Sequence, residues 1–357
     1  MRLLPCGVHV TGTAQREAWD ARVLPPVEQV APGLWSIPVP MPDSPLRYVL
    51  VYALELDDGL ALVDAGWDTP EAWQALCDGL AVLGADITQV RAVAVTHIHP
   101  DHYGLAGRVR EASGAWIGLH AADAALLKGR YVETEQMIAS MTDLLEVSGV
   151  PSELVPDLAG SSMQISSFVR MAPPDRFIEH DEVLEFAGWD LRAIWTPGHS
   201  PGHLCFYSPS RRLLLSGDHV LPRITPNIAV HTQQIHNPLA DYLSSLSTVE
   251  HLECDEVLPG HEWRFSGLAD RVEQLRQHHR ERLDEILTAL AVGSLTCWEL
   301  TTRLTWSRPL EGSTPWLQRA ASGETLAHLV LLESRGEVVR TPGRPACFAL
   351  AGPPPLS

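Results

Sequence analysis

Apolar residues recur along the chain in runs of strand length, and each run ends in a short polar or turn-forming segment. The run Tyr48–Leu56 predicts a strand, and after the Asp57-Asp58-Gly59 turn the run Leu60–Val63 predicts its hairpin partner. Similar runs predict buried strands at Val90–Val95, Leu191–Trp195, Leu204–Tyr207, Leu213–Leu215 and Glu256–Leu258. Helical periodicity lies between them, in Pro70–Leu83 and His102–Ala112. This mixture predicts an α/β (α+β) fold, in which sheets are covered by helices.

The segment 121–175 has a different texture. Ala121–Leu127 and Glu135–Val147 show helical patterns, but 151–174 is rich in Ser, Pro and Gly with scattered apolar residues. A long irregular insertion in a compact domain is typically a functional lid or a disordered linker. We predict a lid.

After Arg264 the pattern changes to helices followed by a hairpin. Leu268–Val292, Thr296–Thr305 and Thr314–Ser334 predict helices, and the segment 337–350 predicts a β-hairpin around a Pro-Gly turn. This order is typical of a winged-helix module. We therefore predict a first domain at 1–265, with its core at 28–265, and a winged-helix-like domain at 266–357.

Composition and charge narrow the range of partners. The chain has 357 residues, with 26 Lys+Arg against 44 Asp+Glu and a formal charge of -18. From residue 264 onward, 11 arginines face 10 acidic residues, a net of +1, so the first 263 residues carry -19. The candidate recognition helix carries Arg319 against Glu324 and Glu333, so it has no basic stripe. Charge therefore argues against a nucleic acid partner.

The sequence also bears on location. No apolar stretch approaches the roughly 20 residues that are needed to cross a bilayer. The apolar run at the start of the chain is too short, and too often interrupted, to be a signal peptide. The six cysteines are scattered, without a CxxC pair. We expect a cytoplasmic protein with no membrane partner.

The strongest chemical signal is Thr96-His97-Ile98-His99-Pro100-Asp101-His102, directly after a predicted strand. Positions two apart in extended backbone point the same way, so His97 and His99 can share one metal ion. Pro100 favours a helix start, so Asp101 and His102 diverge from the first pair and can serve a second ion. Imidazole nitrogens with a hard carboxylate oxygen suit zinc, with iron, manganese or cobalt as alternatives.

Three further predicted strands end in a side chain that can bind metal. His199 and His261 each follow a Pro-Gly pair, and Asp218 follows Ser216-Gly217. Together with the four residues of the HxHxDH motif, they make seven candidate ligands. Seven exceeds the needs of one tetrahedral ion and suits two ions about 3.5–4 Å apart that share a carboxylate.

These motifs, together with Asp64 in Leu62-Val63-Asp64-Ala65-Gly66, resemble the metallo-β-lactamase fold superfamily over residues 28–265. The resemblance implies an αβ/βα sandwich with a dinuclear site at one edge of two packed sheets. It implies a first ion on His97, His99 and His199, and a second on Asp101, His102 and His261. It further implies that Asp218 bridges the two ions and that Asp64 orients the ligands from behind.

Asp218 separates branches of this superfamily. Many true β-lactamases have a cysteine at the matching position, so the resemblance favours the glyoxalase II, lactonase and phosphodiesterase-like branches over antibiotic hydrolysis. The C-terminal part resembles the small domain behind the hydrolase domain in relatives of the β-lactamase-like protein 2 type. This second resemblance rests on the order of the elements. We predict that the module packs on the hydrolase domain, shapes the pocket or mediates a homodimer.

The expected activity follows from the ligands. Two divalent ions, Zn²⁺ before Mn²⁺ or Fe²⁺, lower the pKa of a bridging water and give a hydroxide at neutral pH. Asp101 and Asp218 are the candidate catalytic carboxylates. We expect hydrolysis of a small-molecule ester, thioester or lactone. The alternatives are a phosphodiesterase, endoribonuclease or organophosphate hydrolase with the same site, a DNA-binding regulator, and a mononuclear iron oxygenase.

Four more histidines remain open between a functional and a structural role. His203 belongs to the GHxxGH pattern, and we favour a structural role for it. His219, His231 and His236 could line the pocket, donate a proton or form ordinary loop hydrogen bonds.

Overall fold

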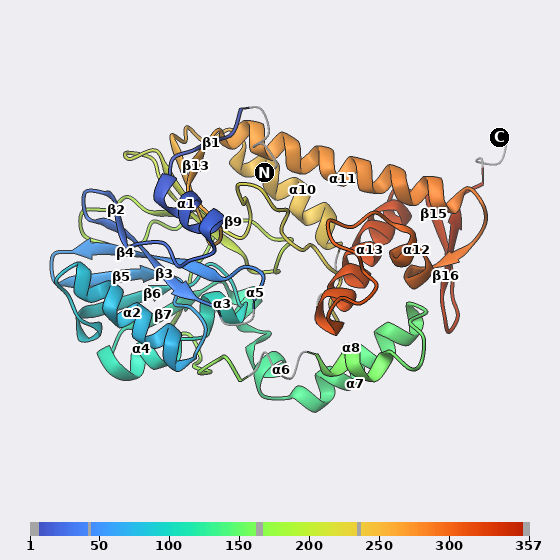
Figure 1. Ribbon diagram of the computed structural model, residues 1–357, viewed down its shortest axis with the longest axis horizontal. Helices are drawn as coiled ribbons and strands as arrows, with labels where there is room; N and C mark the ends of the chain where they lie inside the picture. Colours follow the sequence, from blue (N-terminus) through green and yellow to red (C-terminus); the bar gives the residue numbers. More distant parts are fainter. Residues whose placement is uncertain (1–6, 42–43, 162–166, 234–236, 353–357) are drawn as a thin grey trace.

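Two β-sheets packed face to face form the larger part of the computed structural model, which describes residues 7–41, 44–161, 167–233 and 237–352 (Figure 1). The first sheet has the order β2-β3-β4-β5-β6-β7-β8. Its strands are Glu28–Ala31, Leu34–Pro40, Tyr48–Leu56, Gly59–Val63, Val90–Ala94, Trp116–Leu119 and Arg176–Phe177. Strands β2 to β5 pair antiparallel, whereas β5 to β8 pair parallel.

The second sheet has the order β1-β13-β12-β11-β10-β9. Its strands are His9–Val10, Phe265–Ser266, Glu256–Pro259, Leu213–Gly217, Leu204–Ser208 and Arg192–Trp195. Only the β11–β12 pair of this sheet is parallel. The predicted strands therefore all exist, with ends that differ by one or two residues.

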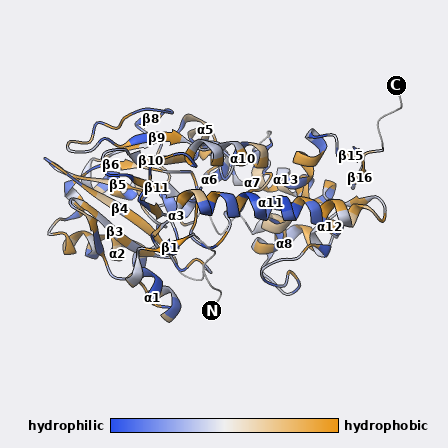
Figure 2. Cartoon of the chain, turned by 90° about the horizontal axis from the view of Figure 1, so that it is seen from above, coloured by the Kyte–Doolittle hydropathy of each residue, from blue (hydrophilic) through white to orange (hydrophobic). Residues whose placement is uncertain are grey.

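The core lies in three layers. Side chains such as Leu50, Phe206 and Leu258 fill the space between the sheets. Helices α2 (Pro70–Val82) and α4 (Ala106–Ser113) cover the outer face of the first sheet, and helices α10 (Pro238–Val249) and α11 (Leu268–Leu290) cover the second. Figure 2 shows the hydrophilic side of α11 turned away from the sheets. The layers confirm the α/β fold expected from the sequence pattern and have the αβ/βα arrangement that the family resemblance implied.

One predicted helix is interrupted. The expected helix His102–Ala112 is two helices, α3 (Pro100–Tyr103) and α4. The Leu105 amide donates to the Gly66 carbonyl (2.8 Å) and so leaves the helical ladder. The chain is tight here, since a Cβ on Gly104 would lie 2.4 Å from the Phe168 carbonyl oxygen. The break holds α3, with two candidate ligands, against the loop after β5.

Strand β3 and helices α1 (Thr13–Ala21) and α10 were not predicted. Strand β3 contains Pro38 and Pro40, which cannot donate to a neighbouring strand. It tolerates them because β2 pairs only with its first half, Leu34 to Ser36, so the prolines lie at an edge.

The insertion after β7 is more regular than the sequence indicated. It holds α5 (Ala121–Ala124), α6 (Leu127–Tyr131), α7 (Thr134–Val147) and α8 (Val155–Gly160), and α8 falls in a stretch expected to be irregular. Residues 162–166 of the predicted lid lie outside the described residues. Ion pairs join Arg344 to Asp143 and Glu146, so the insertion packs on the C-terminal part. A lid role stays a prediction.

The C-terminal part consists of α11, α12 (Cys297–Arg303), α13 (Pro315–Ser334) and a small sheet of order β14-β16-β15. The strands of this sheet are Leu295–Thr296, Cys347–Leu350 and Val338–Thr341. Its apolar core is continuous with that of the second sheet, for example from Tyr207 through Leu275 to Leu329. The domain boundary and the winged-helix assignment stay predictions.

Among the described residues, no helix combines the length and the apolar character that crossing a membrane requires.

Candidate metal centre

The seven candidate ligands meet at one edge of the two sheets. His97 and His99 follow β6, and Asp101 and His102 lie on α3 directly behind them. The other three follow β9, β11 and β12, on the second sheet: His199, Asp218 and His261. The structure thus brings these seven residues together from segments that follow strands of both sheets, and their role as metal ligands stays a prediction.

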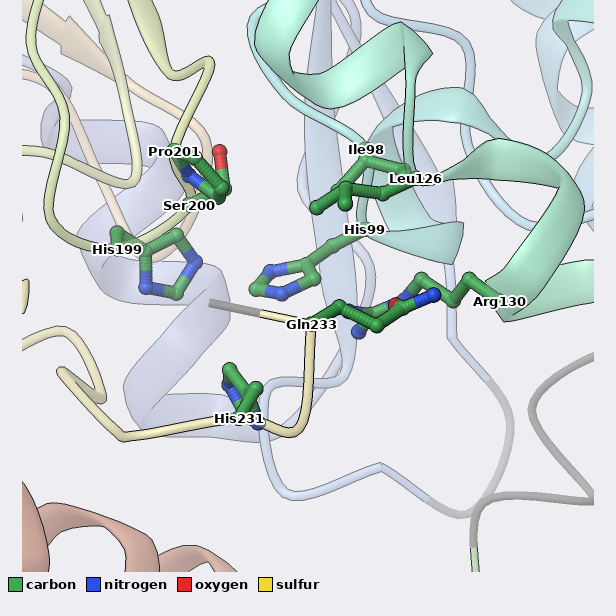
Figure 3. Close-up of a pocket in the computed structure, with 9 residues that line it drawn as sticks. All are labelled: Ile98, His99, Leu126, Arg130, His199, Ser200, Pro201, His231 and Gln233. Atoms are coloured by element: carbon green, nitrogen blue, oxygen red, sulfur yellow. The ribbon is translucent and has the colours of Figure 1, made fainter. Parts of the chain in front are cut away.

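One group consists of His97, His99 and His199. One nitrogen from each ring lies within 4.8 Å of the others. His97 Nε2 is 3.0 Å from His99 Nδ1, and the rings of His99 and His199 are edge-on at a centroid separation of 4.5 Å. Figure 3 shows His99 and His199 on facing sides of a pocket. Burial is the main cause that lowers the pKa of each of these three imidazoles, which favours the neutral, ligating form.

A second group consists of Asp101, His102 and His261. His261 Nε2 lies 3.2 Å from Asp101 Oδ2. Burial opposes the charged forms here, yet the carboxylates around His102 and His261 outweigh it and raise the pKa of both imidazoles, to about 10 for His261. This half of the site therefore concentrates negative charge that positive charge must balance.

Asp218 lies between the two groups. Its Oδ1 is 3.5 Å from His102 Nε2 and 3.4 Å from His261 Nε2, while its Oδ2 is 3.5 Å from His199 Nε2. The carboxylate is only 6% exposed. Burial would raise its pKa, but His261 and His102 outweigh burial and hold that pKa well below its ordinary value. One oxygen thus faces each group, the arrangement of a shared carboxylate.

Unpaired buried atoms test whether these residues fit metal ions. Nε2 of His102, His199 and His261, and Oδ1 of Asp218, are buried without a partner in hydrogen-bonding geometry. Leaving such atoms unpaired costs about 1–3 kcal/mol each. Each of these rings has its Nδ1 engaged by an acceptor, so Nε2 faces the site, and in His102 and His261 a cation would take the place of the proton on Nε2. The donor set therefore fits cations.

The acceptors that fix the rings come from the backbone and from Asp64. His199 Nδ1 donates to the Asn227 carbonyl and His261 Nδ1 to the Tyr48 carbonyl, both at 2.9 Å. His102 Nδ1 donates to Asp64 Oδ2 at 2.7 Å. Asp64 also accepts from the Thr96 amide at 2.7 Å. Asp64 has a φ of 65°, which Asp adopts more readily than most residues.

Sequence reasoning missed Asp123 on α5. Its buried carboxylate accepts from the Ile98 amide (2.8 Å), the Ser200 hydroxyl (2.8 Å) and the Gly202 amide (2.6 Å). These bonds join the loop of His97 and His99 to the loop of His199, across the two sheets. The available signal was a single acid within the apolar helical stretch that begins at Ala121.

The four uncertain histidines differ. His203 is buried, and its Nε2 accepts from the Asp218 amide at 3.1 Å, so it supports the Asp218 loop. His219 packs edge-on against Tyr242. His231 lines the pocket next to His99 and His199. His236 lies outside the described residues.

Comparisons with known proteins agree with this architecture. Residues 44–261 match the model of the metallo-beta-lactamase superfamily. A metallo-beta-lactamase family protein from Thermus thermophilus, TTHA1429, is 33% identical with a TM-score of 0.77, and the match covers 90% of this chain and all of that one. A beta-lactamase domain protein from Burkholderia ambifaria is 27% identical with a TM-score of 0.78, over 96% and 98% of the two chains.

Curated relatives match over shorter spans. The lactamase-like protein vrtG of Penicillium aethiopicum is 30% identical over 38% of this chain and 43% of its own length. This chain thus spans less than half the length of that relative. The probable metallo-hydrolase YqjP of Bacillus subtilis is 26% identical over 75% of this chain and 84% of its own. The chain belongs to the metallo-β-lactamase superfamily of hydrolases.

Proposed function

We propose that the protein is a dinuclear, metal-dependent hydrolase that cleaves a small ester, thioester or lactone. The observation that carries this proposal is the position of Asp218, with one carboxylate oxygen toward each group of ligands. A carboxylate so placed suits two ions better than one. The alternative of a mononuclear oxygenase gives no role to His261, whose buried Nε2 faces the site.

Divalent ions bound by these residues would supply Lewis acidity, both to activate water and to polarise the acyl oxygen of the substrate. The protein's own residues prepare that chemistry. Asp101 and Asp218 provide the negative charge, and Asp64 fixes the His102 ring so that Nε2 faces inward. Zn²⁺ fits a set of five imidazoles and two carboxylates, with Mn²⁺ or Fe²⁺ as the alternatives.

Covalent catalysis by a serine or cysteine has little support. The Ser200 hydroxyl, which lines the pocket, already donates to Asp123. Burial raises the pKa of the Cys205 thiol to about 12, far from that of an activated nucleophile. Hydrolysis by activated water is therefore the simpler proposal.

We also propose a cellular location and a role for the C-terminal part. Five cysteines lie in the described residues and all five are free thiols, which favours a reducing cytoplasm: Cys77, Cys205, Cys254, Cys297 and Cys347. We propose that the C-terminal part shapes the pocket, because Asn227, which binds His199, also donates to Glu324 of α13 (3.3 Å).

A hydrolysis panel combined with metal analysis tests this function. Protein purified without chelators should hold close to two transition metal ions and should cleave at least one of a set of esters, thioesters and lactones. Asp218→Ala should lose that activity and keep cooperative unfolding. Cleavage of phosphodiesters or single-stranded RNA without cleavage of any acyl substrate would replace the proposal with the phosphodiesterase alternative. Full activity of Asp218→Ala would refute the shared-carboxylate mechanism.

A further inference from the structure

Basic side chains from three separate segments gather beside the cleft that opens onto His99 and His199. Arg130 on α6 and His231 line this cleft together with the two ligands (Figure 3). Arg319, on the first turns of α13, is electrostatically coupled to both, because it contributes to lowering the pKa of His231, and Arg130 lowers the pKa of Arg319. None of the three has a role in holding the metals.

Backbone contacts bring these segments together. The segment 227–231 contacts the candidate metal centre, because the Asn227 carbonyl accepts a hydrogen bond from His199. It also contacts α13, because the Val230 amide donates to the Gly323 carbonyl (3.1 Å). Two residues beyond this segment, the Gln233 side chain lies against α6, since a Cβ on Gly129 would be 2.5 Å from Gln233 Nε2. The segment 227–233, which forms one wall of the cleft, therefore lies between the insertion and the C-terminal helix α13.

Positive charge is concentrated in this wall. Within the described part of the chain, no carboxylate lies within ion-pair distance of Arg130. Burial and the adjacent Arg130 guanidinium lower the pKa of Arg319 to about 10. Burial, then Arg130 and Arg319, lower the pKa of His231 to about 3, so this ring is neutral and adds a hydrogen-bonding group while the two arginines carry the charge. Two acids of the packed segments already accept hydrogen bonds: Asp123 from the Gly202 amide and Glu324 from the Asn227 side chain.

We propose that Arg130 and Arg319, together with His231, form an anion-binding subsite at the mouth of this cleft. The substrate then carries a carboxylate or phosphate group at some distance from the bond that is hydrolysed. This inference rests on the proposed hydrolytic function and specifies the class of substrate.

Physical chemistry favours this use of the arginines. Two like charges beside each other repel, and an anion between them converts that repulsion into attraction. The planar guanidinium suits carboxylates and phosphates because it can donate two parallel hydrogen bonds. The first 263 residues carry a net charge of -19, so an anionic substrate would be repelled from this domain without a local positive region.

Matched substrates test the subsite. We suggest 4-nitrophenyl butyrate and the mono-4-nitrophenyl ester of glutarate, which have the same leaving group and differ mainly in a terminal carboxylate. Wild-type enzyme should show a lower KM for the glutarate ester. Arg130→Gln and Arg319→Gln should each raise KM for the glutarate ester about ten- to hundredfold more than for the butyrate ester, the cost of one charge-assisted hydrogen bond.

Lys128→Gln provides the matched control. It removes a positive charge from the same helix, but Lys128 is exposed and pairs with Glu133. It should leave the ratio of the two KM values unchanged. Arg130→Lys keeps the charge and loses the planar donor pair, so it should recover only part of the wild-type ratio. Equal KM changes for both esters in Arg130→Gln and Arg319→Gln would overturn the proposal.

Calorimetric binding separates this proposal from the proposed function. Glutarate should bind the metal-loaded protein at least tenfold more tightly than butyrate, and the difference should shrink in Arg130→Gln and Arg319→Gln even if neither ester is cleaved. Replacing glutarate by 3-phosphonopropionate shows whether carboxylate or phosphate is preferred. If glutarate binds no tighter than butyrate, the subsite does not exist; if it binds tighter but no acyl substrate is cleaved, only the hydrolytic function fails.

Discussion

Replacing Asp64 by Asn should weaken one of the two proposed metal positions and spare the other. The Asp64 carboxylate is 2% exposed and receives the His102 Nδ1 proton at 2.7 Å. Asn has almost the same shape and tolerates the φ of 65°, so the backbone is not strained. Its Oδ1 can still accept from the Thr96 amide, but its NH₂ group would face His102 Nδ1 with a second donor.

That mismatch favours the wrong tautomer, with the proton on Nε2 of His102. Loss of a buried charge-assisted hydrogen bond costs about 1.5–3 kcal/mol. At about 1.4 kcal/mol for each factor of ten, the affinity of the group Asp101, His102 and His261 should fall roughly ten- to hundredfold. The group of His97, His99 and His199 has no direct bond to Asp64, so its affinity should change much less.

Competition of the metal-free protein with a chromophoric zinc chelator measures the two affinities. Asp64→Asn should leave one tight Zn²⁺ and weaken the other, with a small change in the unfolding midpoint. Asp20→Asn, at an exposed acid paired with Arg16, is the control and should bind two ions as the wild type does. Wild-type affinity at both positions, or an equal loss at both, would refute the role assigned to Asp64.

Three further predictions concern stability. Burial raises the pKa of Glu324 to about 7. A carboxyl group whose pKa is higher in the folded state stabilises the fold at a pH below its unfolded pKa of about 4.5. This contribution to stability disappears as the pH rises through about 7. Urea unfolding should therefore show that Glu324→Gln gains stability relative to wild type between pH 5 and pH 8, by at most about 3 kcal/mol; a difference that does not vary with pH would contradict this. Asp123→Asn places an NH₂ group among three donors, so chemical denaturation should show that the free energy of unfolding falls by about 2–4 kcal/mol. The control Asp78→Asn, at an exposed acid in a helix, should lower it by less than about 0.5 kcal/mol. Equal losses in the two variants would argue against the role of Asp123 in joining the loops. Gly104→Ala forces a Cβ against the Phe168 carbonyl and should lower the midpoint of thermal unfolding. The control Gly160→Ala on α8 places a Cβ with no neighbour within 4 Å and should keep or raise that midpoint. An unchanged midpoint in Gly104→Ala would show that the chain around Gly104 has room for a methyl group.

Much of the candidate site was predictable because its candidate ligands follow strands. The spacing of His97, His99, Asp101 and His102 carries the geometry locally, since it depends on one strand end and one helix start. The strands before Asp218 and His261 each contain a short apolar run that is followed by a small or turn-forming residue, so their ends were also clear from the sequence. Local patterns of this kind survive folding with little change.

The parts that were missed depend on contacts between distant segments. Asp123 receives its three hydrogen bonds from residues 25 to 79 positions away. The grouping of Arg130 with Arg319 requires the packing of the insertion beside α13, which no short pattern specifies. Strand β3 was not predicted, and the edge at which its prolines are tolerated is set by the length of β2.

The origin of the ligands in both sheets has a consequence for folding. His97, His99, Asp101 and His102 follow the first sheet, whereas His199, Asp218 and His261 follow the second. The complete set of seven side chains cannot come together before the two sheets have docked, so ions held by ligands from both sheets would connect the two halves of the sandwich. Resistance to unfolding should depend on free metal concentration, by about 2.7 kcal/mol at one hundred times the dissociation constant of a single site. Metal supply would then set the lifetime of the folded protein as well as its activity.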